Sequence, residues 1–223
     1  MPSGEFNLPT ESIMNFAADH ITHRMIRGRR VLEIGIEEGL KEHIMFYKPE
    51  VFIGINNSKR QGNSVDIKLS VYEIEGYFGS QSFDFVYATE VLEHLEDWRN
   101  AITQMKRVTK VGGYVLLSTR SKGYPYHGAA YGDFWRFEQD DLKKIFPDFD
   151  IVALKGDTRM PGVLFIGRKS CRHAAALDNI QLFSIITHKR ELNSPPFSVR
   201  VRLFRTKVLV RELLITLIER MLR

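Results

Sequence analysis

The sequence predicts an α/β protein with a doubly wound, mostly parallel sheet, on three observations. A buried-strand pattern over 31–34 runs into Gly35, and a helical pattern begins after Gly39. Further apolar runs, at 51–55 and 83–88, alternate with helical patterns, as parallel strands joined by helices require. With 223 residues, 43% of them hydrophobic, the chain can form one domain with a substantial core plus an appendage.

The first strand, its glycine turn and the helix that follows form the unit around which the chain is organised, and another helix is expected before them. Residues 9–26 have the apolar spacing of a helix, with Thr10 as its N-cap, and we expect this helix to cover the sheet or a ligand site. Residues 31–34 suit a strand covered on both faces, and Gly35 ends it where the chain turns sharply. Ligands of doubly wound sheets bind at this carboxyl edge.

The glycine spacing after the first strand differs from that of a dinucleotide site. A dinucleotide site usually shows G-x-G-x-x-G, whereas this chain has Glu33-x-Gly35-x-x-x-Gly39, with Glu37 in place of the middle glycine. The acid and the spacing resemble motif I of the class I S-adenosylmethionine-dependent methyltransferases. A dinucleotide brings a pyrophosphate to a helix N-terminus, but S-adenosylmethionine brings a sulfonium cation, which Glu37 and Glu38 would not repel. A strand followed by a glycine turn also occurs in many other α/β proteins.

The second strand and its turn, expected over 51–58, depart from the resembled family. There the strand ends in an acid that binds both ribose hydroxyls, since a carboxylate accepts two hydrogen bonds, and Asn56 stands at that position here. After a short third strand, the acid that reaches the adenine amine is replaced by Ser70, and the backbone of Val71 is the remaining adenine contact. The resemblance therefore implies Glu33 as the one acidic cofactor contact that is kept.

Three segments in the middle of the chain carry the most specific resemblance. They are S-F-D-F-V at 82–86, V-L-E-H-L at 91–95, and a helix end with the following strand at 107–117. In order and spacing they are similar to the type 11 group of class I methyltransferases. The resemblance implies a Rossmann-like fold with a seven-stranded, mostly parallel sheet, helices on both faces, and S-adenosylmethionine as cofactor. No metal is expected, because no His, Asp and Glu cluster has ligand spacing.

Polar residues follow the strand at 83–88. Thr89 and Glu90 come directly after it, where side chains meet the ligand. His94 lies one helical turn beyond Glu90, so the two would share a face, and the alternative for His94 is a packing role near a helix end. The cofactor-binding prediction comprises Glu33, Gly35, Gly39, Asn56, Ser70, Val71, Thr89, Glu90 and His94.

Residues 120–141 form the predicted substrate segment, a glycine- and aromatic-rich loop after a central strand. Its H-x-x-x-x-x-D-F-W-R-F pattern resembles a branch of the type 11 methyltransferases thought to act on sugars or other small metabolites. His127 is the predicted general base for O-methylation, because its unperturbed pKa lies near neutral pH, and Asp133 would orient it or bind a substrate hydroxyl. The predicted substrate contacts are Tyr126, Trp135 and Arg136. The alternative places Trp135 in the core and makes Arg136 and Asp133 an internal ion pair.

The last two strands are expected over 147–154 and 160–168, as the antiparallel hairpin that closes the sheet of the resembled family. The resemblance ends there. It divides the chain into a methyltransferase domain over 1–168, with a helical cap over 1–29, and a basic amphipathic helical extension over 169–223.

The extension carries the charge of the chain. Residues 168–223 hold 12 Lys and Arg against 4 Asp and Glu, a net charge of +8, while the rest is at −3. Helices are expected over 170–192 and 207–222. The apolar arc of the second needs cover, so 197–223 is expected to pack on the protein itself, form a homodimer or contact an anionic membrane. The nearly neutral front argues against a nucleic-acid groove there.

Composition indicates a cytoplasmic protein. Cys171 is the single cysteine, which excludes an intramolecular disulfide and suggests a reducing compartment. No signal peptide is recognisable, and no apolar stretch reaches the roughly 18 residues needed to span a membrane.

Together these features predict S-adenosylmethionine-dependent O-methylation of a small hydroxylated molecule or a glycan. Two alternatives remain at this stage. Asn56 and Ser70 are compatible with a degenerate, non-catalytic member that serves as a binding or assembly module. The basic tail is compatible with an RNA or protein methyltransferase that uses it as an anchor.

Overall fold

The computed structural model describes residues 8–35, 38–57, 66–126, 132–157, 159–172 and 176–194. At its centre is a seven-stranded sheet of order β3-β2-β1-β4-β5-β8-β7. Its strands are β1 (Arg30–Ile34), β2 (Val51–Asn56), β3 (Ile67–Lys68), β4 (Phe83–Thr89), β5 (Thr109–Arg120), β7 (Phe149–Asp157) and β8 (Gly162–Lys169). The first five strands run parallel, and β8 is antiparallel to both β5 and β7. The predicted sheet and its closing hairpin are therefore confirmed.

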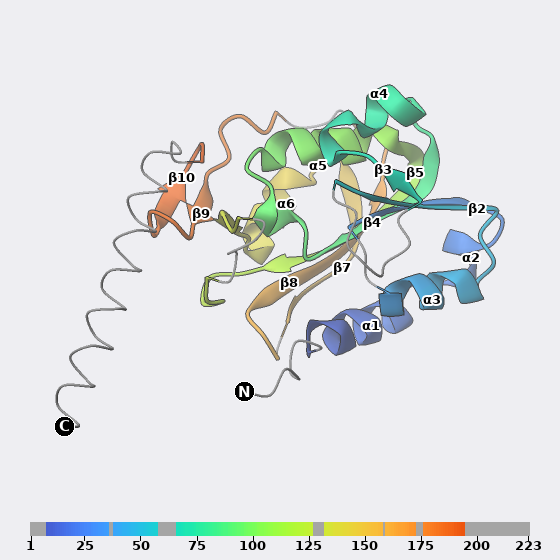
Figure 1. The fold of residues 1–223 in the computed structure, drawn as a ribbon, viewed down its shortest axis with the longest axis horizontal. Coiled ribbons are helices and arrows are strands. Elements are labelled where there is room, and N and C mark those ends of the chain that lie inside the picture. The colour runs from blue at the N-terminus through green and yellow to red at the C-terminus, as the bar shows by residue number, and fades with distance from the viewer. Residues whose placement is uncertain are drawn as a thin grey trace.

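Helices cover both faces of the sheet (Figure 1). On one face lie α1 (Leu8–His20), α2 (His23–Ile26) and α3 (Glu38–Phe46). On the other lie the 3-10 helices η1 (Val71–Glu73) and η2 (Leu92–His94) and the helices α4 (Ile74–Phe78), α5 (Trp98–Val108) and α6 (Gln139–Ile145). The helix predicted over 9–26 is interrupted at Ile21–Thr22, which separates α1 from α2.

The side chains of the central strands point alternately into two hydrophobic cores, one on each face of the sheet. In β1, Val31 faces the core under α1 and α3, whereas Leu32 and Ile34 face the core under α5 and α6. Because side chains of a strand point alternately to opposite faces, a strand covered on both sides must be apolar throughout. This explains the continuous apolar runs of the sequence.

Helix α5 shows how a local pattern fixes its packing. The Asp97 side chain accepts a hydrogen bond from Asn100 N at 3.1 Å and so caps the helix. The helix buries one apolar stripe against the sheet, as its spacing predicts. That stripe consists of Trp98, Ala101, Ile102, Met105 and Val108.

The extension differs from the prediction. The helix expected over 170–192 is wrong: this segment contains β9 (Leu182–Ser184) and β10 (Lys189–Glu191), which join β6 (Trp135–Arg136) in a three-stranded sheet. Leu177 and Leu182 pack in the core of α5 and α6, so the apolar residues there are held by sheet pairing and packing. The helix predicted over 207–222 lies outside the described residues.

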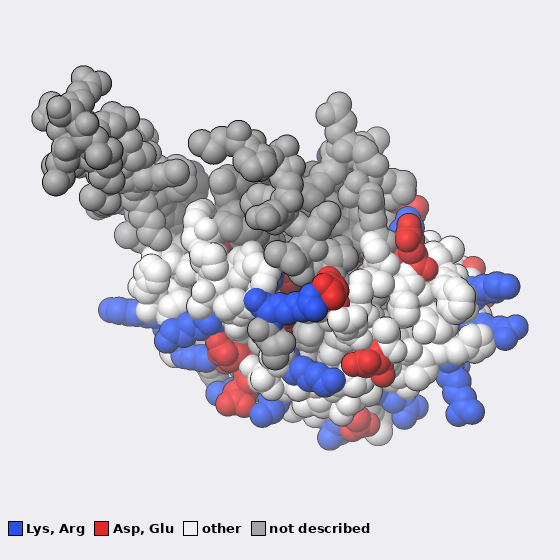
Figure 2. Space-filling view, turned by 90° about the horizontal axis from the view of Figure 1, so that it is seen from below, with Lys and Arg blue, Asp and Glu red and all other residues white. Residues whose placement is uncertain are grey.

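Surface charge is mixed on the face drawn in Figure 2, where Lys and Arg side chains lie among Asp and Glu. Within the described ranges, this face shows no continuous basic stripe. In the same part of the chain, no helix has both the length and the apolar character needed to cross a membrane.

Candidate active site at the carboxyl edge of the sheet

The carboxyl ends of β1, β4 and β5 meet at one edge of the sheet. Ile34 pairs with Ala88, and Thr89 pairs with Ser118, so the residues that follow these strands lie side by side. Charged residues lie at two of these ends: Glu90 directly follows β4, and Arg120 is the last residue of β5. This edge is therefore the candidate site.

Gly35 forms the turn after β1 and requires glycine. Its φ of +84° lies in the left-handed region, and a Cβ there would lie 2.7 Å from Val91 Cγ2. Gly35 N donates to Ile55 O at 3.1 Å, which ties the turn to β2. These features fix the turn after β1, and the cofactor contact of Gly35 stays a prediction.

Glu33 lies buried in β1, with Gly54 of β2 as its register partner. A Cβ on Gly54 would come within 3.2 Å of Glu33 Oε2 and 3.4 Å of Asp66 Oδ2. The glycine thus makes room for two carboxylates at this edge. Asp66, which the sequence did not single out, accepts a hydrogen bond from Gly54 N at 2.7 Å.

The other predicted cofactor residues occupy the same edge with different roles. Asn56 ends β2, and Gly39 lies in the first turn of α3. The Ser70 hydroxyl accepts a hydrogen bond from Tyr72 N at 3.3 Å and caps η1, so its side chain serves the local turn. Val71 and Thr89 are buried.

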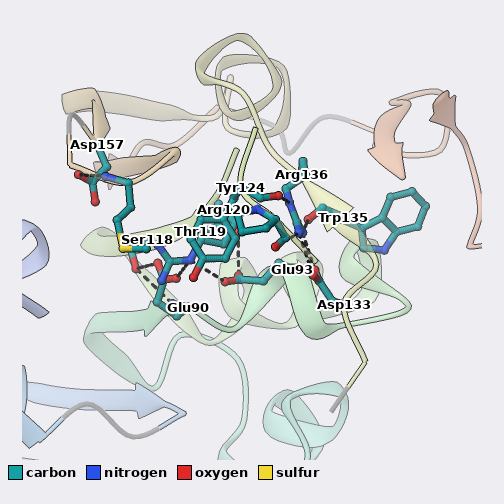
Figure 3. Close-up of polar contacts among 12 residues, drawn as sticks. Glu90, Glu93, Ser118, Thr119, Arg120, Tyr124, Asp133, Trp135, Arg136 and Asp157 are labelled. Atoms are coloured by element: carbon teal, nitrogen blue, oxygen red, sulfur yellow. Dashed lines mark hydrogen bonds and ion pairs between the residues drawn. The ribbon is translucent and has the colours of Figure 1, made fainter. Parts of the chain in front are cut away.

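Glu90 adopts a left-handed conformation with φ +55°, which is uncommon for a residue with a side chain. Ser118 holds it there: Glu90 N donates to Ser118 O at 3.0 Å and to Ser118 Oγ at 3.1 Å, and Ser118 Oγ–H donates to Glu90 Oε1 at 2.8 Å. The other oxygen, Oε2, forms an ion pair with Arg120 Nε. Figure 3 shows the carboxylate pointing from β4 toward β5.

A second carboxylate, Glu93 of η2, shares the same guanidinium. Thr119 Oγ1–H donates to Glu93 Oε2 at 2.9 Å, and Glu93 Oε1 lies 3.9 Å from Arg120 Nε (Figure 3). Burial raises the pKa of Glu93. Burial, reinforced by the charge of Glu93 and opposed by Arg120, raises the pKa of Glu90 to about 8. Sequence inspection missed this cluster, although the spacing E-x-x-E and an arginine at a strand end were visible.

The predicted shared face of Glu90 and His94 is wrong. Glu90 precedes η2 in a left-handed conformation, so no helical turn joins it to His94. The two side chains take different partners: Glu90 contacts Ser118 and Arg120, while His94 Nδ1 lies 2.5 Å from Gly132 O. His94 thereby connects η2 to the predicted substrate loop.

Three predicted substrate-loop residues belong to the interior. Asp133 and Arg136 form a buried ion pair, and Arg136 also donates to Tyr124 O at 3.2 Å and Pro125 O at 3.1 Å. Trp135 is fully buried in the core and donates from Nε1 to Glu96 O at 3.2 Å. The substrate contacts predicted for Trp135 and Arg136 are therefore corrected to structural roles, whereas the role predicted for Asp133 beside His127 stays a prediction.

The remaining loop residues stay candidates. Tyr126 is 42% exposed, and burial together with the charge of Asp133 raises the pKa of its hydroxyl. His127, the predicted base, lies outside the described residues.

The fold and the edge geometry define a Rossmann-like α/β protein with a class I methyltransferase sheet. The family model described as a methyltransferase domain matches residues 11–155. The chain therefore belongs to the S-adenosylmethionine-dependent methyltransferase family.

Relatives among curated proteins are named ubiquinone biosynthesis O-methyltransferase. The chain is 31% identical to that of Dechloromonas aromatica and 25% identical to that of Vibrio atlanticus, in each case over 134 residues and 54% of this chain. It spans about half the length of these relatives, 57% and 56%.

Solved structures agree on the fold. The PH0226 protein of Pyrococcus horikoshii matches with TM-score 0.56 and 16% identity, over 75% of this chain and 92% of that one. A 1,6-didemethyltoxoflavin-N1-methyltransferase of Burkholderia thailandensis, solved with bound 1,6-didemethyltoxoflavin and S-adenosylhomocysteine, matches with TM-score 0.55 and 14% identity, over 74% of this chain and 80% of that one.

Proposed function

We propose that this chain transfers the methyl group of S-adenosylmethionine to a hydroxyl oxygen of a small hydroxylated molecule or a glycan. The observation that carries the proposal is the Gly35 turn packed against the segment that bears Glu90, at the carboxyl edge of a methyltransferase sheet. The relatives named O-methyltransferases support oxygen as the methylated atom.

The residues at this edge fit S-adenosylmethionine. Gly35 has no side chain between its backbone and a ligand, Glu33 supplies a buried carboxylate, and Asn56 ends the neighbouring strand. Asn56 would meet the ribose hydroxyls, and the backbone of Val71 the adenine. When bound, the cofactor supplies an electrophilic methyl group on a sulfonium, and the task of the chain is to hold the acceptor hydroxyl against it and remove its proton.

The test is calorimetric titration with S-adenosylmethionine and S-adenosylhomocysteine, followed by a screen of phenols, catechols and sugars in which release of S-adenosylhomocysteine is measured. We expect micromolar binding that Glu33→Gln weakens at least tenfold. Circular dichroism confirms that the variant is folded, and Glu50→Gln, at the amino end of β2, is the matched control. Failure of both compounds to bind at millimolar concentration would favour the non-catalytic alternative.

A further inference from the structure

The cluster of Glu90, Glu93 and Arg120 at the site edge has one more acidic than basic side chain. Glu90 and Glu93 share Arg120, whose guanidinium also lies 4.1 Å from the ring centroid of Tyr124. A buried carboxylate and a partly buried one beside a single cation favour retention of a proton, because a second uncompensated charge in this environment is costly.

One carboxylate oxygen of this cluster lacks a hydrogen bond that would compensate its burial. Glu93 Oε1 is buried and has no hydrogen-bond donor among the described residues, with Arg120 Nε 3.9 Å away. Glu93 Oε2 accepts the Thr119 hydroxyl. A proton shared between the two carboxyls would supply the missing donor.

The two carboxyls differ in access. The Glu93 side chain is 0% exposed and that of Arg120 is 4% exposed, whereas the Glu90 side chain keeps 19% of its surface exposed. A proton that enters or leaves this cluster therefore passes through Glu90.

Glu90 also lies between the two predicted binding regions. On one side, Val91 is in contact with the Gly35 turn, as the 2.7 Å approach of a Cβ at Gly35 shows. On the other, Phe134 N donates to Glu93 O at 2.8 Å, which attaches the substrate loop to η2. The cluster thus borders both the cofactor turn and the loop.

We propose that Glu90 is the proton acceptor of the methyl transfer, charged while the cationic methyl donor is bound and protonated once the methyl group has left. The proposal rests on the proposed function. In the step, the substrate oxygen bonds to the methyl carbon, the carbon–sulfur bond breaks with its electron pair on sulfur, and the hydroxyl proton passes to the Glu90 carboxylate.

Sulfur changes from a cationic sulfonium to a neutral thioether in the reaction, and this change drives the loss and gain of the Glu90 proton. A sulfonium near Glu90 stabilises the carboxylate and expels the retained proton, and conversion to a neutral thioether removes that stabilisation. The raised pKa of free Glu90, about 8, means that the proton gained from the substrate is kept after product leaves, until the next S-adenosylmethionine binds.

The charged groups around Glu90 come from four elements. Glu93 and His94 belong to η2, and Arg120 to β5; the ion pair of Asp133 and Arg136 is internally compensated, and Glu33 of β1 lies at the neighbouring strand end. Of these, Glu93 raises and Arg120 lowers the pKa of Glu90.

The experiment counts protons released on binding. S-adenosylmethionine and S-adenosylhomocysteine are titrated calorimetrically into the full chain at pH 7.5, in two buffers of different ionisation enthalpy. The two compounds differ in the sulfonium charge and its methyl group, so the difference in released protons isolates the response to that charge. We expect S-adenosylmethionine to release more, by about half a proton to one proton.

The variants assign the difference to a residue. Glu90→Gln, which can keep a hydrogen bond with Ser118, should abolish it, while Glu50→Gln and His127→Ala should retain it. Equal release for both compounds in the unmodified chain, or a difference that Glu90→Gln retains and His127→Ala loses, would overturn the inference while leaving the proposed function intact. Absence of any binding would overturn both.

Discussion

Asp133 and Arg136 form a two-pronged ion pair in which both side chains are fully buried, with Arg136 Nη2 donating to Asp133 Oδ2 at 2.8 Å. The pair holds the start of β6 against the segment that follows β5, because Arg136 also donates to the carbonyls of Tyr124 and Pro125. Because the ion pair is fully buried, we infer that it supports the structure around the site.

Asp133→Asn should therefore destabilise the protein. Removing one partner leaves the buried Arg136 cation uncompensated, which costs about 3–5 kcal/mol of unfolding free energy and lowers the melting temperature by about 10 °C. Thermal denaturation measures it, with Asp140→Asn, from the exposed pair with Lys143, as a control that stays close to the parent. An unchanged melting temperature with lost activity would contradict this structural role and support the predicted catalytic role of Asp133.

Gly35→Ala should weaken cofactor binding about tenfold or more, equivalent to ~1.4 kcal/mol. The added Cβ meets Val91 Cγ2 at 2.7 Å, and the left-handed φ of +84° strains any side chain. Pairing the change with Val91→Ala relieves the steric part and leaves the backbone strain, so calorimetry on the double variant should show partial recovery. Full recovery would mean that the conformation of Gly35 is unimportant.

Asn56→Asp should tighten the binding of S-adenosylhomocysteine about tenfold, because a carboxylate accepts two ribose hydroxyls in charge-assisted hydrogen bonds. Asn56→Ala provides the comparison and should bind more weakly than the parent. If the aspartate variant binds more weakly than the parent, the ribose does not lie at the end of β2.

Stability should depend on pH through Glu90. Its pKa is raised from 4.5 to about 8, so the folded state holds this proton more tightly than the unfolded chain. The resulting stabilisation is fully present below pH 4.5, declines as pH rises, and is lost above about pH 8.

Glu90→Gln should remove this dependence. At pH 5 the melting temperature of the variant should be close to that of the parent. At pH 9 it should be higher, by about 2–4 °C for each kcal/mol that the buried charge of Glu90 costs the parent. Arg120 then faces Glu93 alone, with matched charge. A variant that melts lower than the parent at pH 9 would show that the Glu90 carboxylate is stabilising there.

The sequence was sufficient for elements whose residues share one local pattern. The apolar run at β1, the stripe of α5 and the turn at Gly35 each depend on neighbours within a few positions. The motif segments at 82–86 and 91–95 added the family, which the match over residues 11–155 confirmed.

Where the apolar positions also suit a strand, the pattern misled. Leu182 and Ile186 fit a helical stripe over 170–192, yet β9 pairs with β6 through a partner nearly fifty residues earlier in the chain. A pairing of that sequence separation leaves no signature in the local spacing, and tertiary contact overrides local propensity.

By itself, the sequence determined the fold class and the strand edge at which Glu33, Gly35 and Glu90, three residues of the predicted site, lie. Only the tertiary structure decided their chemistry. It placed Glu93 and Arg120 against Glu90, and it buried Asp133 with Arg136. The reason is physical: strand and turn preferences act between neighbours in the chain, whereas burial and charge pairing depend on groups that folding brings together from distant positions.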